Sequence, residues 1–166
     1  MTVWGRILAA GAGSAALLAG ALAFQFIGGL APCPLCIWQR CPHVAAVVIA
    51  VLGVTVLARH YRPLAVLGAL AMLIDAGLGL YHTGIERGWW QGPDTCTSSS
   101  ITDLSTDQLM AQILGAPLVR CDEVAWEFLS LSMASWNAVI SLCLAGLWLA
   151  LAVRAPNPYD SSSASQ

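Results

Sequence analysis

Residues 64–81 read LAVLGALAMLIDAGLGLY, an almost unbroken apolar run in which Asp75 is the only charged side chain. A helix of this length extends for about 27 Å, close to the thickness of the hydrocarbon core of a bilayer. Three further apolar runs occupy residues 7–30, 44–58 and 133–153. The second of these is short, and it reaches spanning length when it is extended back towards Cys41. The sequence therefore predicts an all-α membrane protein with four transmembrane helices, over about 7–28, 42–59, 64–82 and 133–153.

The composition of the whole chain agrees with a membrane location. Of its 166 residues, 58% are hydrophobic and only 10% are charged, whereas about 25% of the residues of a soluble domain are charged. The formal net charge is −2, so the charge balance gives no indication of nucleic acid binding. A signal peptide is the alternative reading of the first run, but that run is longer than the roughly 7–15 residue core of such a peptide.

Four spans place both termini on one side of the membrane and leave two external connections, residues 29–41 and 83–132. These connections contain all the cysteines except Cys143, a concentration typical of a compartment in which disulfides persist. Arginines are slightly more frequent on the side of the termini, which predicts that both termini are cytoplasmic. We expect a single domain over residues 1–155, followed by a disordered cytoplasmic tail over 156–166 that is rich in serine and proline.

The second external connection also contains a helix start signal. Ser105-Thr106-Asp107-Gln108 has the pattern of a capping box, which predicts a short helix that continues to about residue 114. This helix is expected either at the membrane interface or packed over the core of its own loop.

The first external connection contains Cys33 and Cys36, a pair with the two-residue spacing of thiol–disulfide exchange sites. Pro34 suits the first position of a helix, so Cys33 is expected at a helix start and Cys36 in its first turn. Helix N-termini and nearby cations both favour a thiolate, and Arg40 follows Cys36 by about one helical turn. The pattern therefore predicts a redox-active pair, with a static disulfide or half of a zinc site as the alternatives.

Cys96 and Cys121 both lie in the second connection, 25 positions apart. A disulfide between them would stabilise the fold by roughly 3 kcal/mol, and as a pair they fit a structural staple and an exchange site equally well. Their wide spacing fits poorly with a four-cysteine zinc site, which favours redox chemistry over metal binding. The remaining cysteines, Cys41 and Cys143, are expected to be small buried apolar side chains.

Asp75, His82 and Glu86 are spaced so that they share one face of the third predicted helix. His82 would lie at the outer interface, level with Arg40, where the two side chains are able to hydrogen-bond the carbonyl oxygens of a quinone. The alternative is ordinary interfacial hydrogen bonding by both residues. Asp75 would lie near the middle of the membrane, where an isolated carboxylate is costly, and we expect it to bond to a neighbouring helix.

Three blocks of the sequence resemble the DsbB-type disulfide bond formation proteins of bacterial inner membranes. The blocks are CPLCIWQR at residues 33–40, YHTGIERGWWQGPDTC at 81–96, and CDEVAW at 121–126 followed by LSMASWN at 131–137. Together with the four spans they make a specific match. Gln39 departs from the pattern, since some members of the family carry an acidic residue at that position.

The resemblance implies two redox-active disulfides, Cys33–Cys36 and Cys96–Cys121, that act in series. Cys96 would form a mixed disulfide with a thioredoxin-fold partner, and Cys121 would then reach Cys33. Electrons would pass to the first pair, whose Cys36 thiolate would contact a quinone.

The resemblance also implies the surroundings of that quinone and the role of the protein. Arg40 and His82 would bind the quinone, which is ubiquinone or menaquinone. The protein would be a thiol:quinone oxidoreductase of the bacterial inner membrane that reoxidises a periplasmic DsbA-like protein, with its cysteines on the periplasmic face. Its partners would be that protein, the quinone pool and the membrane lipids. The alternative is a metal-binding or structural membrane protein whose cysteines are static, although no metal site is predicted.

Overall fold

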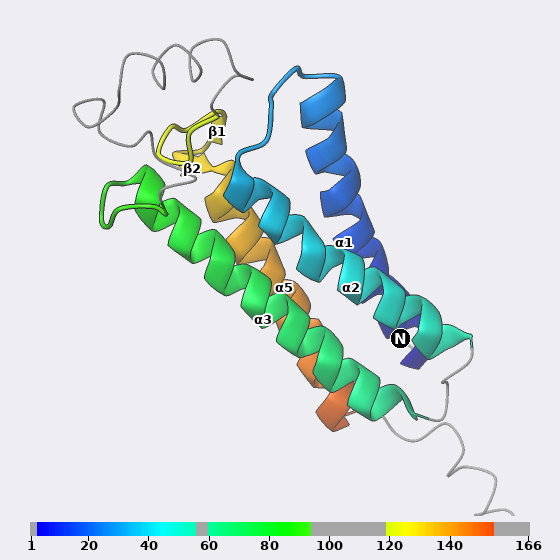
Figure 1. The fold of residues 1–166 in the computed structure, drawn as a ribbon. Helices are drawn as coiled ribbons and strands as arrows, with labels where there is room; N and C mark the ends of the chain where they lie inside the picture. Colours follow the sequence, from blue (N-terminus) through cyan, green and yellow to red (C-terminus); the bar gives the residue numbers. More distant parts are fainter. Residues whose placement is uncertain (1–2, 56–59, 94–118, 155–166) are drawn as a thin grey trace, which may run out of the picture.

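The computed structural model describes residues 3–55, 60–93 and 119–154 (Figure 1). Their helices are α1 (Val3–Phe26), α2 (Pro34–Val54), α3 (Tyr61–Glu86) and α5 (Met133–Arg154). Within these residues, four helices are long and apolar enough to cross a membrane. The prediction of a four-helix membrane protein is confirmed. The predicted interfacial helix near residues 105–114 and the predicted disordered tail lie outside the described residues.

Helix α2 begins eight residues before the span expected from residue 42, so much of the predicted first connection is helical. Pro34 occupies the first turn and Cys33 caps the helix, as the position of the proline predicts. Pro42 lies inside the helix without ending it. A proline removes one helical hydrogen bond, and neighbouring helices in a bundle compensate for such losses. The sequence predicts that Pro42 either kinks the helix or restarts it, and the structure excludes the restart.

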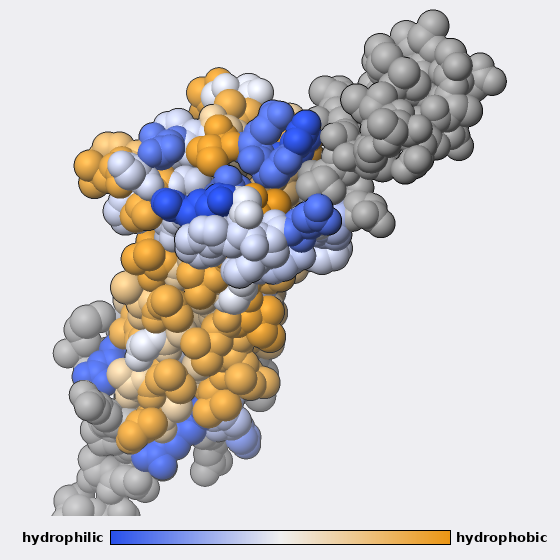
Figure 2. All heavy atoms as spheres, turned by 90° about the vertical axis from the view of Figure 1, so that its left-hand side faces the viewer, coloured by the Kyte–Doolittle hydropathy of each residue, from blue (hydrophilic) through white to orange (hydrophobic). Residues whose placement is uncertain are grey.

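The helices pack through small side chains. Helix α3 has its most extensive contact with α5, while α2 contacts both α1 and α3. Alanines dominate the central core cluster, which also contains Met72, Trp148 and Leu151. Small residues are favoured at such interfaces because they let helix backbones approach closely in a solvent that is itself apolar. The larger apolar side chains face outwards, and Figure 2 shows them as a hydrophobic band between hydrophilic ends.

The exposed band also contains two cysteines. Cys41 on α2 and Cys143 on α5 are both exposed, so the prediction that they are buried against protein is wrong. In a membrane, lipid tails accept a small apolar side chain as readily as a protein core does. Apolar character alone therefore did not distinguish the two environments.

Gly68 provides the closest approach between α3 and the indole of Trp148, which is 1% exposed. A Cβ atom at Gly68 would lie 2.5 Å from Trp148 Cδ2. We expect Gly68→Ala to lower the free energy of unfolding by about 1–3 kcal/mol, because overpacking displaces the indole. Gly77→Ala on the same helix is the matched control, since a Cβ there meets nothing within 4 Å. Denaturation of both variants in detergent tests this, and equal stabilities would contradict it.

A two-residue hairpin joins the second connection to α5. Strands β1 (Glu127–Phe128) and β2 (Leu131–Ser132) pair antiparallel, and Leu129 and Ser130 between them have φ angles of 51° and 60°. Turns of this geometry usually contain asparagine or glycine, so the residues gave no signal for a hairpin. The hairpin lies at the end of the bundle where α2 begins and α3 ends (Figure 1).

Candidate thiol redox site

Cys33 and Cys36 are brought together by the first turn of α2. Cys33 is the N-cap residue, and its sulfur accepts a hydrogen bond from the backbone N–H of Cys36 at 3.2 Å. Its S–H donates to the Cys36 sulfur across 2.8 Å. Both are free thiols in this structure, so the site is in its reduced form and a disulfide between them remains a prediction for the oxidised form.

The two thiols are not equivalent. The hydrogen bond to Cys36, together with burial, raises the pKa of the Cys33 thiol far above its usual range. Cys33 therefore keeps its proton while Cys36 accepts it as a hydrogen bond. The negative charge of a singly deprotonated pair is thus expected on the Cys36 sulfur.

A third sulfur lies beside this pair. Cys121 is fully buried, and its Sγ, the Cys33 Sγ and a ring nitrogen of His82 all lie within 4.8 Å of one another. Cys121 is disulfide-bonded, and its predicted partner Cys96 lies outside the described residues. Three cysteines from two connections that are far apart in the sequence thus meet beside one histidine of α3.

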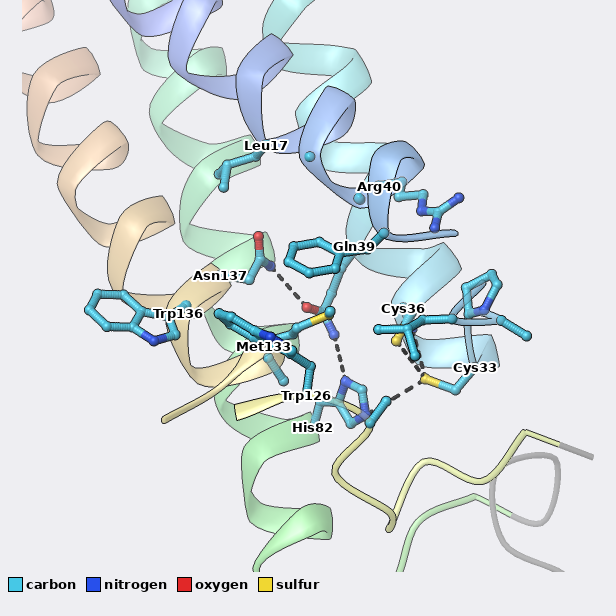
Figure 3. A pocket seen from close by; sticks show the side chains of 18 of the residues that line it. Leu17, Cys33, Cys36, Gln39, Arg40, His82, Trp126, Met133, Trp136 and Asn137 are labelled. Carbon is cyan, nitrogen blue, oxygen red and sulfur yellow. Dashed lines mark hydrogen bonds between the residues drawn. The ribbon is translucent and has the colours of Figure 1, made fainter. Parts of the chain in front are cut away.

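The His82 ring joins the thiols to a polar network inside the bundle (Figure 3). Its Nε2 lies 3.7 Å from the Cys33 sulfur, and its Nδ1 lies 2.9 Å from Gln39 Nε2. Asn137 of α5 donates to Gln39 Oε1 at 2.9 Å. The same Asn137 amide donates to Asp75 Oδ2 at 2.8 Å.

Asp75 has no exposed surface and is held from two helices. Ser141 donates to its Oδ2 at 2.7 Å, and His43 Nε2 lies 3.0 Å from the same oxygen. His43 Nε2 also lies 3.0 Å from Asn137 Oδ1. The expectation that Asp75 bonds to a neighbouring helix is confirmed, because α5 supplies two of its partners.

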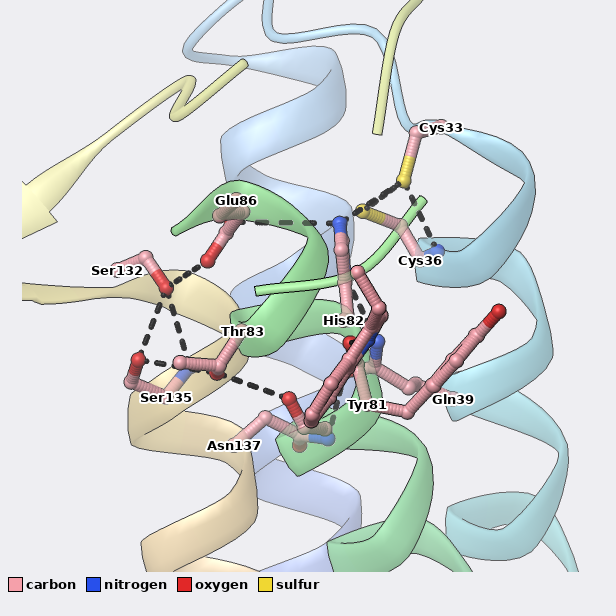
Figure 4. Close-up of polar contacts among 12 residues, drawn as sticks. Cys33, Cys36, Gln39, Tyr81, His82, Thr83, Glu86, Ser132, Ser135 and Asn137 are labelled. Atoms are coloured by element: carbon pink, nitrogen blue, oxygen red, sulfur yellow. Dashed lines mark hydrogen bonds and ion pairs between the residues drawn. The ribbon is translucent and has the colours of Figure 1, made fainter. Parts of the chain in front are cut away.

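Glu86 completes the predicted face of α3 and binds the hairpin (Figure 4). Its carboxylate lies 4.0 Å from His82 Nε2 and accepts a hydrogen bond from Ser132, the last residue of β2. Ser132 also contacts Ser135, which in turn contacts Thr83. These bonds fix the hairpin against the end of α3 that carries His82.

A mostly apolar pocket of about 250 Å³ opens beside the thiols. Cys33, Cys36, Arg40 and His82 all line it, together with aromatic walls from Phe24, Trp126 and Trp136. The rings of Phe24 and Trp126 are 5.2 Å apart. Cys33, Cys36, Arg40 and His82 therefore share one cavity, whereas Cys121 lies beside Cys33 and His82 without lining it. Cys96 lies outside the described residues.

Arg40 points its guanidinium towards α1. Its Nη1 donates to Gln25 Oε1 at 2.7 Å, while its Nε is buried without a hydrogen-bond partner among the described residues. His43 Nδ1, in another residue of the pocket lining, is likewise buried without a partner there. Buried polar atoms without partners are uncommon in native proteins, and they call for an explanation such as a catalytic role or a bound water or ion. Asp75 Oδ1 and Trp148 Nε1 are also buried without partners among the described residues, but they do not line the pocket.

Sequence reasoning missed three residues of this site: Gln39, His43 and Asn137. Asn137 interrupts the apolar run 133–153, and a polar side chain inside a membrane span is costly unless it is paired, so this signal was present in the sequence. His43 lies just before the run 44–58, at the start of a predicted span. Gln39 was assigned to the external connection, so its position in a span became evident only from the structure.

Comparisons with known proteins agree with this arrangement. The family described as "Disulfide bond formation protein DsbB" matches residues 5–151. A disulfide bond formation protein B of Methylococcus capsulatus is 38% identical over 144 residues, which cover 80% of this chain and 82% of that protein. A disulfide bond formation protein B of Polaromonas is 31% identical over 147 residues, which cover 84% of this chain and 84% of that protein. A disulfide bond formation protein B of Dechloromonas aromatica is 31% identical over 140 residues, which cover 78% of this chain and 80% of that protein. No solved structure gives a significant match. The chain therefore belongs to the DsbB family of membrane proteins that take part in disulfide bond formation.

Proposed function

We propose that this protein is a thiol:quinone oxidoreductase that reoxidises a periplasmic DsbA-like dithiol protein and passes the electrons to a membrane quinone. The observation that carries the proposal is the position of Cys33, whose sulfur lies 2.8 Å from Cys36 and within 4.8 Å of Cys121. A sulfur between two others is the arrangement that disulfide exchange in series requires.

The exchange steps balance without any further reactant. A partner thiolate attacks Cys96, forms a mixed disulfide with it and releases Cys121 as a thiolate. Cys121 then attacks the sulfur of Cys33 in an oxidised Cys33–Cys36 pair. The Cys33–Cys121 bond forms, the Cys33–Cys36 bond breaks, and the electron pair leaves on Cys36. The partner's second thiolate then breaks the mixed disulfide and releases Cys96, which attacks Cys121 and releases Cys33. The partner and the Cys96–Cys121 pair are then oxidised, and the Cys33–Cys36 pair holds the two electrons. The N-cap position of Cys33 supports this assignment, since Cys36 then sits in the first turn, where the helix dipole favours its thiolate.

The pocket fits a quinone head group. Its walls are apolar and aromatic, Cys36 lies on its lining, and Arg40 Nε and His43 Nδ1 are buried polar atoms without partners in the described structure. When bound, a quinone supplies a two-electron, two-proton acceptor for the thiols. Arg40 would orient the head group and stabilise negative charge near Cys36, and His82 would hold a proton beside Cys33. The geometry does not distinguish ubiquinone from menaquinone.

The orientation follows from the same chemistry. Stable exchange of disulfides requires an oxidising compartment, which in bacteria is the periplasm. The cysteine end of the bundle, with the hairpin and the second connection, would therefore face the periplasm. Both termini would then be cytoplasmic, in a multi-pass protein of the inner membrane.

A metal centre is the second candidate, because Cys33, His82 and Cys121 together would provide three ligand atoms. Thiolate and imidazole are the ligands that zinc prefers. Cys121, however, is disulfide-bonded in this structure, so its sulfur is not a thiolate ligand. The pocket beside Cys36 also has no role in a structural metal site.

Turnover by the purified protein distinguishes the two candidates. We expect the full-length chain in detergent to decrease the absorbance of a soluble quinone when a reduced thioredoxin-fold dithiol protein is added, with one disulfide formed per quinone consumed. Elemental analysis of the same sample is expected to show substoichiometric zinc. Stoichiometric zinc without quinone consumption would overturn the proposal in favour of the metal centre.

A further inference from the structure

A chain of hydrogen bonds runs from Asp75 to Cys33, and the donor and acceptor of each bond can be assigned. Its intermediate members are Asn137, Gln39 and His82. The Oδ2 atom of Asp75 has three nitrogen or hydroxyl groups within 3.0 Å, from Asn137, Ser141 and His43. Asn137 and Ser141 donate to this oxygen, so Oδ2 acts as a hydrogen-bond acceptor. Asp75 is therefore the fixed acceptor from which the direction of the other bonds follows.

Asn137 is the first side chain whose orientation Asp75 determines. Its Nδ2 has two hydrogens, and it donates one to Asp75 and the other to Gln39 Oε1. The flipped amide would place its oxygen against these two acceptors, which is unfavourable in a buried site. In the observed orientation Asn137 Oδ1 faces His43 Nε2 at 3.0 Å, so that nitrogen is a donor.

Gln39 determines which ring nitrogen of His82 carries the proton. Because its oxygen accepts from Asn137, its amide nitrogen is the group that faces His82 Nδ1 at 2.9 Å. An NH₂ group is only a donor, so Nδ1 must accept and cannot carry a hydrogen. The proton of the neutral ring is then on Nε2, which faces the Cys33 sulfur at 3.7 Å and Glu86 at 4.0 Å. The ring also has a hydrogen bond with the backbone of Cys121, so both redox-site cysteines that neighbour His82 are within reach of this proton.

We propose that Asp75, acting through Asn137 and Gln39, fixes the proton of His82 on Nε2, where it hydrogen-bonds the sulfur of Cys33. Asp75, Asn137 and Gln39 are positioning residues in this scheme, and they touch none of the sulfurs. The hydrogen-bond inventory of Cys33 is consistent with it. The Cys33 sulfur donates once, to Cys36, and accepts from the Cys36 N–H and from His82.

The effect of this proton on disulfide transfer from Cys121 to Cys33 rests on the proposed function. When a Cys121 thiolate attacks Cys33 and the electron pair leaves on Cys36, negative charge is shared among three sulfurs. A donor at His82 Nε2 stabilises that charge, whereas the other tautomer would direct a lone pair at it. Loss of one hydrogen bond to a charged group is expected to slow the disulfide transfer by roughly 10- to 100-fold.

The tautomer can be measured without a partner protein or a quinone, so its failure is separable from failure of the proposed function. The full-length chain is labelled with ¹⁵N-histidine and reduced in detergent, and the ¹⁵N shifts of protonated and unprotonated ring nitrogens are read. The chain has three histidines, and a His82→Asn sample identifies the signals of interest. We expect wild-type His82 to carry its proton on Nε2.

Three variants test the path of the effect. Gln39→Glu presents an acceptor to Nδ1 and is expected to move the proton there, with a 10- to 100-fold slower appearance of the Cys33–Cys121 disulfide. Asp75→Asn replaces the carboxyl by an amide that can present either its oxygen or its NH₂ group to Asn137, so it no longer fixes the direction of the other bonds and is expected to give both tautomers. Ser141→Ala is the matched control, because Ser141 bonds Asp75 but lies off the path to His82, and it should leave the tautomer unchanged.

The results that would overturn the inference are specific. A wild-type proton on Nδ1 would do so, as would a Gln39→Glu protein that keeps the proton on Nε2. A proton that moves while the disulfide transfer rate stays constant would remove the chemical role. Because His43 contacts Asp75 directly, its signal is not a folding reporter for these variants, and thermal unfolding in detergent shows instead whether each one is folded. If Asp75→Asn does not fold, Gln39→Glu is the deciding test.

Discussion

Cys36→Ser is expected to reduce dithiol-dependent quinone consumption to background, a loss of roughly a thousandfold or more. A serine hydroxyl neither forms a disulfide nor ionises near neutral pH, so the electron pair has no sulfur on which to leave towards the pocket. The assay is the decrease in quinone absorbance with a reduced thioredoxin-fold partner. Cys41→Ser is the matched control, since Cys41 is on the same helix but exposed, and it should retain full activity.

The same variant is expected to accumulate an internal cross-link. Without Cys36, Cys33 loses the hydrogen bond that contributes most to its raised pKa. Its thiolate then attacks the disulfide-bonded Cys121, the Cys33–Cys121 bond forms, and the former partner of Cys121 leaves as a thiolate. The two sulfurs lie within 4.8 Å, so little movement is needed. Mass spectrometry of a non-reduced digest would detect the linked peptides. Normal turnover by Cys36→Ser, or loss of turnover by Cys41→Ser, would contradict the assigned roles.

The sequence predicted the four membrane-spanning helices and the positions of several residues that meet beside the thiols, because those features are local. Length and apolarity alone identify a membrane span, and the Cys33-Pro34 pair marks a helix start. The face shared by Asp75, His82 and Glu86 follows from helical spacing. Each of these inferences needs only residues that are within a few turns of one another.

Other features depend on contacts that no local pattern contains. Helix α2 continues through Pro42 because the bundle outweighs the loss of one hydrogen bond. The hairpin turns at Leu129 and Ser130, whose side chains usually avoid positive φ angles. In each case tertiary packing overrides the intrinsic preference of the residues.

The polar network shows the same limit within the site itself. Asn137 and Asp75 are 62 positions apart, and Asn137 and Gln39 are 98 apart. A single polar residue in an apolar run indicates that it has a hydrogen-bond partner, but the sequence does not identify that partner. Only the packing of α2, α3 and α5 shows that these side chains form one connected group.

The largest effect on stability is expected from separating His43 and Asp75. Their side chains are 3% and 0% exposed and lie 3.0 Å apart, and Asp75 is the only acidic residue of its apolar run. His43→Leu would leave a buried carboxylate with neutral donors alone. Breaking a buried pair by removing one partner costs about 3–5 kcal/mol, so we expect a loss of that size in unfolding measurements in detergent.

A second substitution separates loss of charge pairing from loss of packing. In His43→Leu/Asp75→Asn the charge is gone, while the side chain at position 75 retains an oxygen that can accept from Ser141. If the pair is ionic, the double variant should recover most of the stability lost in His43→Leu. A double variant as unstable as the single would mean that His43 acts through its volume.

Because Asp75→Asn also frees Asn137 to flip, the recovered protein should have a mixed His82 tautomer and slow disulfide transfer. Compared with His43→Leu, the double variant would then be more stable but slower in disulfide transfer. If Asp75 had only a structural role, the two quantities would change together.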